Sequence, residues 1–437
     1  MSGIPADVDA NAAPPMTIPL RHFVVALAFL VAGVAVGVVG GRAGYLAQVH
    51  LLLAGWVCLT IMGAVTQFVP VWCGVELHSQ RLAATQLPLA AVGFAGLAAG
   101  FLTATPALLP VAGTFALIGV WILCYNIGRT LLAADPDVTA IHFGWALVFF
   151  ALVTVAGIGL ALDHAVGVLP LLGVGRQGLL LTHGTLAVFG AVLTTVAGAL
   201  AQLAPMFTQA DTGKVEAAVQ RAETVLYPLG VLALAGGRLV GSAALARFGA
   251  VLVAAGIGVV AALLARQLVS ARVEWSPMLT RYSVAAVSLI FWAGLTVTRW
   301  WQDPLSYSGL LGHPSTVLLV GGVGFVVLGT LYHVVPFIVW VHRYSDRLGF
   351  EDVPMVDDLY DHRIAALDAA ALTLAYGLLV SKQWLETPDG TPLFAGALVL
   401  LGALLFAGNL VAVLVEHSPQ SLPTLLTGRE PTAAEDS

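Results

Sequence analysis

The chain has 437 residues, of which 59% are hydrophobic and only 10% charged, and its formal net charge is −6. A soluble globular domain carries about 25% charged residues, so a chain this poor in charge could not cover a surface that faces water. Together with a mean hydropathy of +0.93, the composition excludes a soluble domain. It predicts an all-α, polytopic protein of the cell membrane, with lipid as a partner and no role for nucleic acid.

Twelve apolar runs follow one another along the chain, and a membrane-spanning helix needs about 20 such residues. The predicted spans are 21–40, 46–72, 84–104, 107–134, 140–162, 177–206, 223–241, 243–269, 282–301, 312–341, 363–383 and 391–416. They make up one membrane domain over residues 21–417. Residues 1–20 and 418–437 are rich in polar residues, Ala and Pro, which predicts two disordered tails.

The positions of Lys and Arg predict the orientation. Twelve of the 18 lie on the side of the membrane that holds the N-terminus and the loops after even-numbered spans. The other six lie on the opposite side: Arg42, Arg176, Arg238, Arg247, Arg299 and Lys382. Positive charge is enriched on the cytoplasmic side of membrane proteins, so both termini are expected to be cytoplasmic.

Three of the spans share a pattern: a His at one end, Gly in the middle, and a Gln or His three residues before a Pro. They run from His50 to Pro70, from His183 to Pro205 and from His313 to Pro336. The histidines are 133 and then 130 residues apart, which predicts three pseudo-repeated four-helix arcs, at about 21–134, 140–269 and 282–416. Chance similarity among Gly-rich helices is the alternative.

The three histidines are candidate metal ligands. All three spans are even-numbered, so their histidines are expected at one depth, near the outer face. An ionisable side chain inside a membrane helix is costly and suggests function, and neutral imidazole is a common iron ligand. His50 and His313 could therefore hold a haem from both sides, with His183 as a further metal ligand. The alternative is that each histidine only hydrogen-bonds a carbonyl group of a neighbouring helix.

Arg299 lies at the outer end of the ninth predicted span, followed by two Trp residues. A haem held near the outer face would direct its anionic propionates toward this level of the membrane. Arginine is suited to carboxylate binding, so Arg299 is a candidate cofactor-binding residue. Arg and Trp are also usual anchors at membrane interfaces, and that role is the alternative.

Twelve spans in three four-helix arcs, with His50, His183 and His313 near the outer face, resemble the catalytic subunit of the haem-copper oxidase superfamily, which includes terminal oxidases and membrane nitric oxide reductases. The resemblance implies one haem b at His50 and His313, copper at His183, and an electron-donor protein or additional subunits as partners. It also implies oxygen or nitric oxide reduction.

The sequence departs from that family at three places. The residue four positions after His183 is Ala187 where the family often has Tyr, the seventh predicted span has no His, and Pro314 and Ser315 follow His313. The copper site is therefore expected to be degenerate. A haem-binding membrane redox protein remains the main expectation, and these residues leave open whether the protein is an enzyme, such as an oxidase or a nitric oxide reductase.

Two other functional classes stay open. One is a secondary transporter of a small solute, and the other is a sensor or accessory protein that binds haem or metal without turnover. Among the remaining ionisable residues, Asp368 is expected to pair with a polar group on a neighbouring helix. His142 and His333 are expected to have structural roles near the cytoplasmic face.

Overall fold

The computed structural model describes residues 14–41, 44–307 and 313–427, and twelve of its helices are long and apolar enough to cross a membrane. The predicted all-α, twelve-span fold of a multi-pass membrane protein is confirmed. Nine spans are uninterrupted α-helices: α1 (Thr17–Val39), α4 (Gln80–Leu102), α5 (Leu108–Leu131), α6 (Val138–Val166), α9 (Lys214–Val240), α10 (Ala243–Val269), α11 (Pro277–Gln302), α14 (His362–Ser381) and α15 (Thr391–His417).

The other three spans each contain a π-helical segment. The second consists of α2 (Tyr45–Val49), η1 (His50–Cys58) and α3 (Leu59–Cys73); the sixth of α7 (Arg176–Thr185), η3 (Leu186–Val192) and α8 (Leu193–Thr208); the tenth of α12 (His313–Thr316), η4 (Val317–Gly324) and α13 (Phe325–Arg343). π segments are rare and frequently mark functional sites. They occur in the same three spans that share the sequence pattern, which supports the threefold repeat as a prediction.

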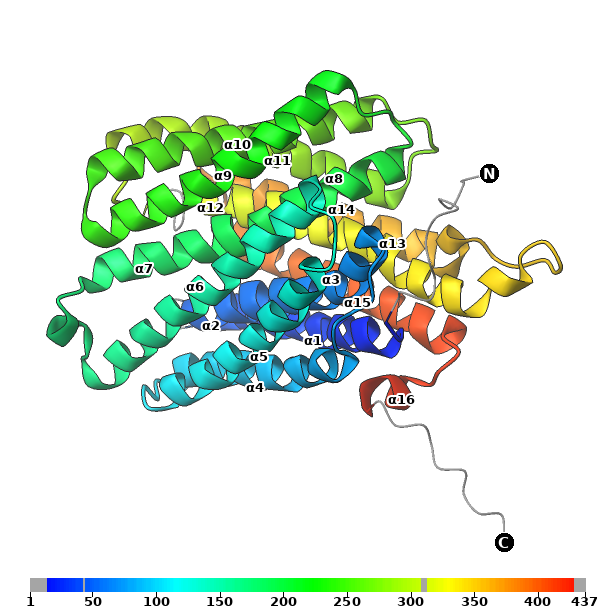
Figure 1. The fold of residues 1–437 in the computed structure, drawn as a ribbon, viewed down its shortest axis with the longest axis horizontal. Coiled ribbons are helices and arrows are strands. Elements are labelled where there is room, and N and C mark those ends of the chain that lie inside the picture. Colours follow the sequence, from blue (N-terminus) through cyan, green and yellow to red (C-terminus); the bar gives the residue numbers. More distant parts are fainter. Residues whose placement is uncertain (1–13, 42–43, 308–312, 428–437) are drawn as a thin grey trace, which may run out of the picture.

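These three spans form the interior of the molecule. Within their most apolar windows, 67% to 78% of the residues are buried, compared with 22% to 56% in the other nine spans. The inner helices therefore contact protein on nearly all sides, while the outer helices present one side to lipid. Figure 1 shows α9, α10 and α11 along one side of the bundle and α4 and α5 along the other.

Glycine lets neighbouring outer helices approach closely, which is how helices associate where lipid is as apolar as their side chains. A Cβ atom at Gly119 of α5 would lie 2.6 Å from the backbone nitrogen of Ala90 in α4. At Gly230 of α9, it would lie 2.6 Å from the Cβ of Leu252 in α10. No larger residue fits at these positions without separating the helices.

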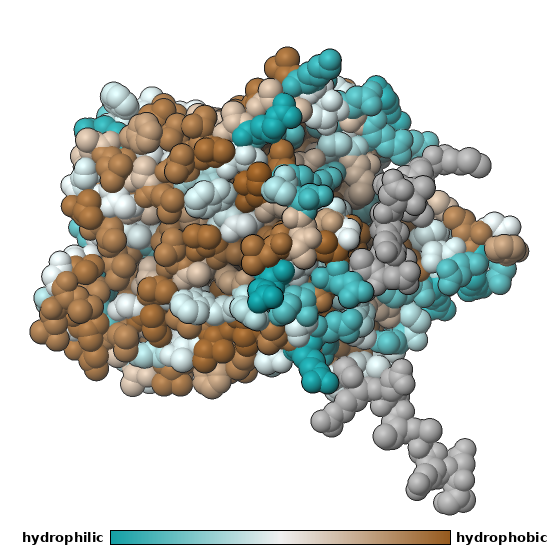
Figure 2. All heavy atoms as spheres, in the orientation of Figure 1, coloured by the Kyte–Doolittle hydropathy of each residue, from teal (hydrophilic) through white to brown (hydrophobic). Residues whose placement is uncertain are grey.

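The helices run along the long axis of the molecule, so the two membrane faces lie at its ends (Figure 1). We call the end at which α1 begins and α15 ends the terminal face, and the other end the opposite face. Hydrophobic residues cover most of the side shown in Figure 2, and hydrophilic ones gather toward the terminal face. The terminal face also carries η5 (Ser345–Arg347), η6 (Val356–Leu359) and α16 (Leu422–Thr427). Its assignment to the cytoplasm stays a prediction.

Both predicted tails are partly helical. The first helix begins at Thr17, within the predicted tail, because Ile18 and Leu20 are buried and Pro19 is tolerated in a first turn. Near the other end, α16 forms within the predicted tail and its Leu425 is fully buried. Apolar residues in both segments thus pack against the bundle instead of remaining free.

Two spans also begin earlier than predicted. The seventh begins at Lys214 instead of 223, and the ninth at Pro277 instead of 282. In both cases the hydropathy of the sequence falls because polar residues, such as Glu216 and Arg281, lie inside the helix. Tertiary contacts supply those polar groups with partners, so the helix continues past the point where composition alone would end it.

Candidate functional site

His50 begins the π segment η1 and is half-buried. Its Nδ1 lies 2.8 Å from the carbonyl oxygen of Leu46, and its ring packs against Phe101 of α4 with ring centroids 4.9 Å apart. A carbonyl oxygen can only accept, so Nδ1 carries the proton and Nε2 has the free lone pair. A second hydrogen bond of this kind is what fixes the orientation of histidines that bind metals.

His183 lies in α7 and has the same arrangement. Its Nδ1 donates to the carbonyl oxygen of Val153 in α6 at 3.0 Å. The ring packs against Gly157, where a Cβ atom would lie 3.0 Å from its Cε1. Within the described residues, neither His183 Nε2 nor His50 Nε2 has a hydrogen-bond partner. His183 lies within electrostatic range of His50, which places the two imidazoles in the same region of the bundle.

The other two predicted site residues are less defined. His313 begins α12, but its side chain lies outside the described part of the structure. Arg299 is half-buried near the end of α11, and its guanidinium makes no hydrogen bond or ion pair with another described residue. The haem at His50 and His313 and the propionate contact of Arg299 therefore stay predictions.

Arg238 of α9 is a candidate binding residue that the sequence did not reveal. Its side chain is only 2% exposed, and its guanidinium lies 5.1 Å from the ring of Trp300. Nε donates to the carbonyl oxygen of Pro304 at 3.0 Å, and Nη1 donates to Thr185 at 2.7 Å, two residues after His183. Asp303 is within electrostatic range. Nη2 is buried without a partner among the described residues.

Buried polar atoms without partners lie at two levels of the bundle. Toward the opposite face three are N–H donors, namely Trp56 Nε1, Arg238 Nη2 and Trp292 Nε1; the Thr296 hydroxyl, which can donate or accept, and the acceptor Gln383 Oε1 lie toward this face too. Toward the terminal face they are mostly acceptors, namely Gln67 Oε1, Gln86 Oε1, Asn126 Oδ1 and Glu223 Oε1, with Arg281 Nε as the exception. Buried donors are normally paired, so the first set fits an anionic group such as the propionate edge of a haem. The second set fits proton donors.

Near the terminal face, the first and third helices of each predicted repeat are joined by a polar contact. We call these contacts the first, second and third interhelix pairs. They are His22 of α1 with Gln86 of α4 at 3.2 Å, His142 of α6 with Glu223 of α9 at 2.7 Å, and Arg281 of α11 with Asp368 of α14. The first residue of each pair also donates to the carbonyl four residues earlier in its own helix, in Ile18, Val138 and Pro277.

Each pair lies against a glycine of the inner helix between its two helices. A Cβ atom at Gly63, Gly198 or Gly329 would lie 2.7, 2.7 and 3.3 Å from the Cβ of His22, His142 and Arg281. Eight residues earlier in each inner helix, a second glycine contacts the residue seven positions later in the outer helix: Gly55 with Phe29, Gly190 with Phe149 and Gly321 with Ser288. Matching contacts at matching positions support the predicted repeat.

The third interhelix pair confirms the expected partner of Asp368. Arg281 and Asp368 are fully buried, and the second carboxylate oxygen of Asp368 accepts a hydrogen bond from Tyr332. Asn409 in turn donates to the Tyr332 hydroxyl at 3.1 Å. Both carboxylate oxygens of Asp368 therefore have a strong donor, while Arg281 keeps one buried N–H, at Nε, without a partner among the described residues.

Two histidines near the terminal face, His333 and His22, pack inside the bundle. His333 packs edge-to-face against Phe207 with ring centroids 4.4 Å apart, which confirms its packing role. His22, in the second turn of α1, is only 1% exposed because Gly63 makes room for it. For the second pair, the sequence signal was the spacing of polar residues at 216, 220, 223 and 227, which places them on one helical face.

No group of three or more His, Cys, Asp or Glu side chains within the described ranges is arranged to hold a metal ion. The side chain of His313 falls outside those ranges. A search against protein-family models finds no match to this chain, and a search of curated proteins finds no similar sequence. The interpretation of the site therefore depends on its own geometry.

Proposed function

We propose that this protein is a haem-binding integral membrane redox protein, with His50, His183 and His313 at its metal site. The observations that support this most are that His50 and His183, 133 residues apart in the chain, lie within electrostatic range of each other and are held by the same kind of hydrogen bond. Each directs its Nδ1 proton to a carbonyl group and keeps Nε2 for another partner. Two such imidazoles on inner helices suit metal coordination better than simple helix packing.

The surrounding residues suit the anionic edge of the cofactor. Arg238 and the indole N–H groups of Trp56 and Trp292 are buried donors without partners, and they could receive propionate oxygens; Arg299 is the more exposed alternative. A bound haem would supply one-electron chemistry at its iron. Oxygen or nitric oxide reduction, with an electron-donor protein or further subunits, is the form of redox chemistry that we propose. A copper ion would need about three nitrogen ligands, of which His183 supplies one.

The test is the haem and copper content of the purified protein, together with its reduced-minus-oxidised absorbance spectrum. We expect the wild type to bind one haem b, and His50→Ala and His313→Ala to lose it while remaining folded. His164→Ala is the matched control, since His164 is exposed at the same face, and it should keep full haem content. Wild-type protein that purifies without colour from haem-replete cells would overturn the proposal.

A secondary transporter receives less support. Transporter sites are commonly built where helices are broken at the membrane midplane, whereas the described parts of the three inner spans continue through their π segments. Solute uptake into vesicles that survives His50→Ala and His313→Ala would favour a transporter. A haem that binds nitric oxide or carbon monoxide without turnover would instead favour a sensor.

A further inference from the structure

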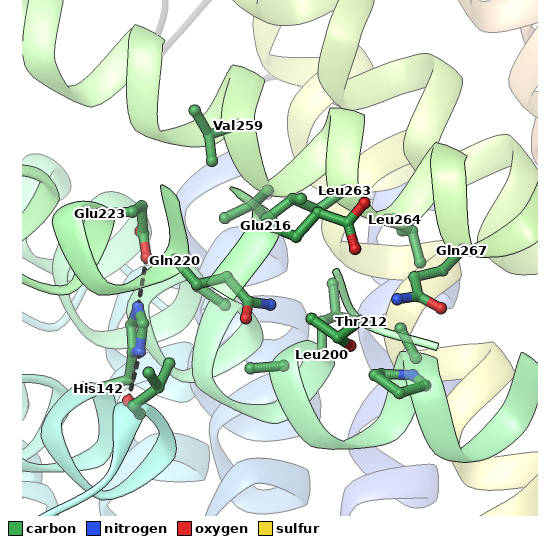
Figure 3. A pocket seen from close by; sticks show the side chains of 16 residues that line it. His142, Leu200, Thr212, Glu216, Gln220, Glu223, Val259, Leu263, Leu264 and Gln267 are labelled. Carbon is green, nitrogen blue, oxygen red and sulfur yellow. Dashed lines mark hydrogen bonds and ion pairs between the residues drawn. The ribbon is translucent and has the colours of Figure 1, made fainter. Parts of the chain in front are cut away.

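In the second interhelix pair, one carboxylate oxygen of Glu223 has no hydrogen-bond partner among the described residues. Glu223 is 6% exposed, and its Oε2 lies 2.7 Å from His142 Nε2. Its other oxygen, Oε1, is buried and has no partner among the described residues. Glu223 lines a cavity of about 30 Å³ between α6, α8, α9 and α10 (Figure 3). A cavity of that size holds one or two water molecules if polar groups line it.

Polar side chains do line that cavity. Thr212 precedes α9, Glu216 and Gln220 belong to α9, and Gln267 comes from α10, while α8 contributes only apolar side chains. In Figure 3, Gln220 lies between Glu223 and Glu216. Glu216 is already paired with Arg266, whose Nη1 donates to it at 2.8 Å. The two carboxylates of the cavity therefore differ. Glu216 is paired with an arginine, whereas the only ionisable hydrogen-bond partner of Glu223 among the described residues is His142.

A polar stripe on α9 connects this cavity with the terminal face. Glu216, Gln220, Glu223 and Tyr227 follow one another at helical spacing on one face of α9. Side-chain exposure is 14% at Glu216 and 5% at Glu223, and Tyr227 as a whole is 2% exposed. The stripe thus leads from the terminal face into the protein, over about 16 Å at 1.5 Å per residue.

The stripe ends at the π segment of the sixth span. The Tyr227 hydroxyl donates to the carbonyl oxygen of Phe189 in η3 at 2.7 Å. The next two residues on that face of α9, Val231 and Leu234, are fully buried and apolar. They separate the stripe from Arg238 and Thr185 near the opposite face. The polar region therefore crosses half of the membrane and is closed at its inner end.

The hydrogen bonds fix where protons can reside. Nδ1 of His142 lies 2.8 Å from the carbonyl oxygen of Val138, so Nδ1 carries a proton. One further proton is shared between His142 Nε2 and Glu223 Oε2, as imidazolium with carboxylate or as imidazole with carboxylic acid. Both arrangements have the same net charge. A second proton, carried by water in the cavity, could be received at Glu223 Oε1, which raises the charge of the pair by one.

Few other charges face the pair. Asp137, which precedes α6, is within electrostatic range of His142, and Tyr227 on α9 is within range of Glu223. On α9 and α10, Glu216 and Arg266 neutralise each other. Among the described residues that line the cavity, α8 adds no ionisable group.

We propose that His142, Glu223 and their cavity form a proton-binding site that is loaded from the terminal face past Glu216 and Gln220. Its ligand is a proton together with water. Imidazole favours softer metals, and hard cations prefer oxygen ligands throughout, so the histidine argues for a proton over an alkali cation. The site depends on its own contacts and does not require haem binding, so failure of one proposal leaves the other standing.

The experiment is an infrared pH titration of the full-length protein in lipid nanodiscs, between about pH 5 and 8, the range in which a histidine side chain ordinarily changes charge. We expect a pH-dependent carboxyl band that Glu223→Gln abolishes and that His142→Gln shifts. Glu274→Gln removes an exposed carboxylate at the terminal face and should leave the band unchanged. In liposomes with one protein orientation, the band should follow the pH on the side of the terminal face.

Three results would overturn the proposal. The band could persist in Glu223→Gln, it could follow sodium concentration at fixed pH, or it could follow the pH on the opposite side. If Glu223→Gln does not fold, Glu223→Asp decides the matter, because it keeps the carboxyl group and should shift the band. A band that Glu223→Asp and His142→Gln both leave unchanged belongs to another residue.

Discussion

The second and third interhelix pairs occupy matching places in two parts of the molecule but have opposite chemistry. Asp368 receives strong donors on both oxygens, from Arg281 and Tyr332, whereas Glu223 receives one, from His142, and keeps the other oxygen toward a cavity. Arginine stays charged throughout the physiological range, and histidine does not. The same geometry therefore gives a fixed ion pair in one place and a site able to exchange protons in the other.

The first interhelix pair provides the neutral reference. The amide of Gln86 donates to His22 Nε2 and to Thr66 at 3.1 Å, so this contact contains no charge. The three pairs form a series: neutral, titratable and permanently ionic. Differences among them can be tested by converting one kind into another.

The largest effect is expected at the third pair. Asp368→Ala leaves the buried Arg281 without a counter-charge, which typically costs about 3–5 kcal/mol, so the thermal midpoint in detergent should fall sharply. The double variant Arg281→Met with Asp368→Leu should recover most of that loss, because no charge remains buried. An Asp368→Ala protein as stable as the wild type would show that Arg281 does not depend on Asp368 as its counter-charge.

Tyr332→Phe should have the next largest effect. It removes the hydrogen bond to Asp368 and the acceptor for Asn409. A hydrogen bond to a charged group contributes about 1.5–3 kcal/mol. Chemical unfolding in mixed micelles should show a loss of this size that becomes smaller in the Arg281→Met, Asp368→Leu background, where only the acceptor for Asn409 is removed. An equally large loss in that background would assign the effect to the Asn409 contact instead of the hydrogen bond to Asp368.

The glycines against the pairs offer a matched comparison. A methyl group at Gly198 would lie 2.7 Å from the Cβ of His142, whereas the nearest atoms at Gly329 are 3.1 Å away. Overpacking costs about 1–3 kcal/mol, so Gly198→Ala should destabilise the protein by that amount and Gly329→Ala by less. Equal losses of thermal stability in the two variants would contradict the spacing described here.

Glu223→Gln should change stability by less than about 1 kcal/mol, because the amide can donate to His142 Nε2 in the way that Gln86 donates to His22. The variant converts the second pair into the chemistry of the first. A large loss of stability would mean that Glu223 is mainly structural.

The smallest effect is expected in the loop before α14. Asp361 accepts from the backbone N–H groups of Arg363 and Ile364, and these hydrogen bonds lower the pKa of its carboxyl group. A lowered pKa stabilises the folded state above the unfolded value of about 3.9 and loses that effect as pH falls toward the folded pKa. Asp361→Asn keeps the N-cap hydrogen bonds but cannot ionise. We therefore expect the thermal midpoint of this variant to fall slightly less than that of the wild type when the pH is lowered below about 4.

The sequence by itself determined the twelve spans, the shared pattern that distinguishes three of them with their histidines, and the need of Asp368 for a partner. Composition and helical spacing carry this information, because a lipid environment requires long apolar helices. The tertiary structure decided the rest. In the sequence, Glu223 was only the first residue of a predicted span, whereas in the structure it lines a cavity. Arg238 is a buried donor whose partner, Thr185, lies two residues after His183. Partners and cavities depend on how helices distant in the chain pack, and no local pattern records that.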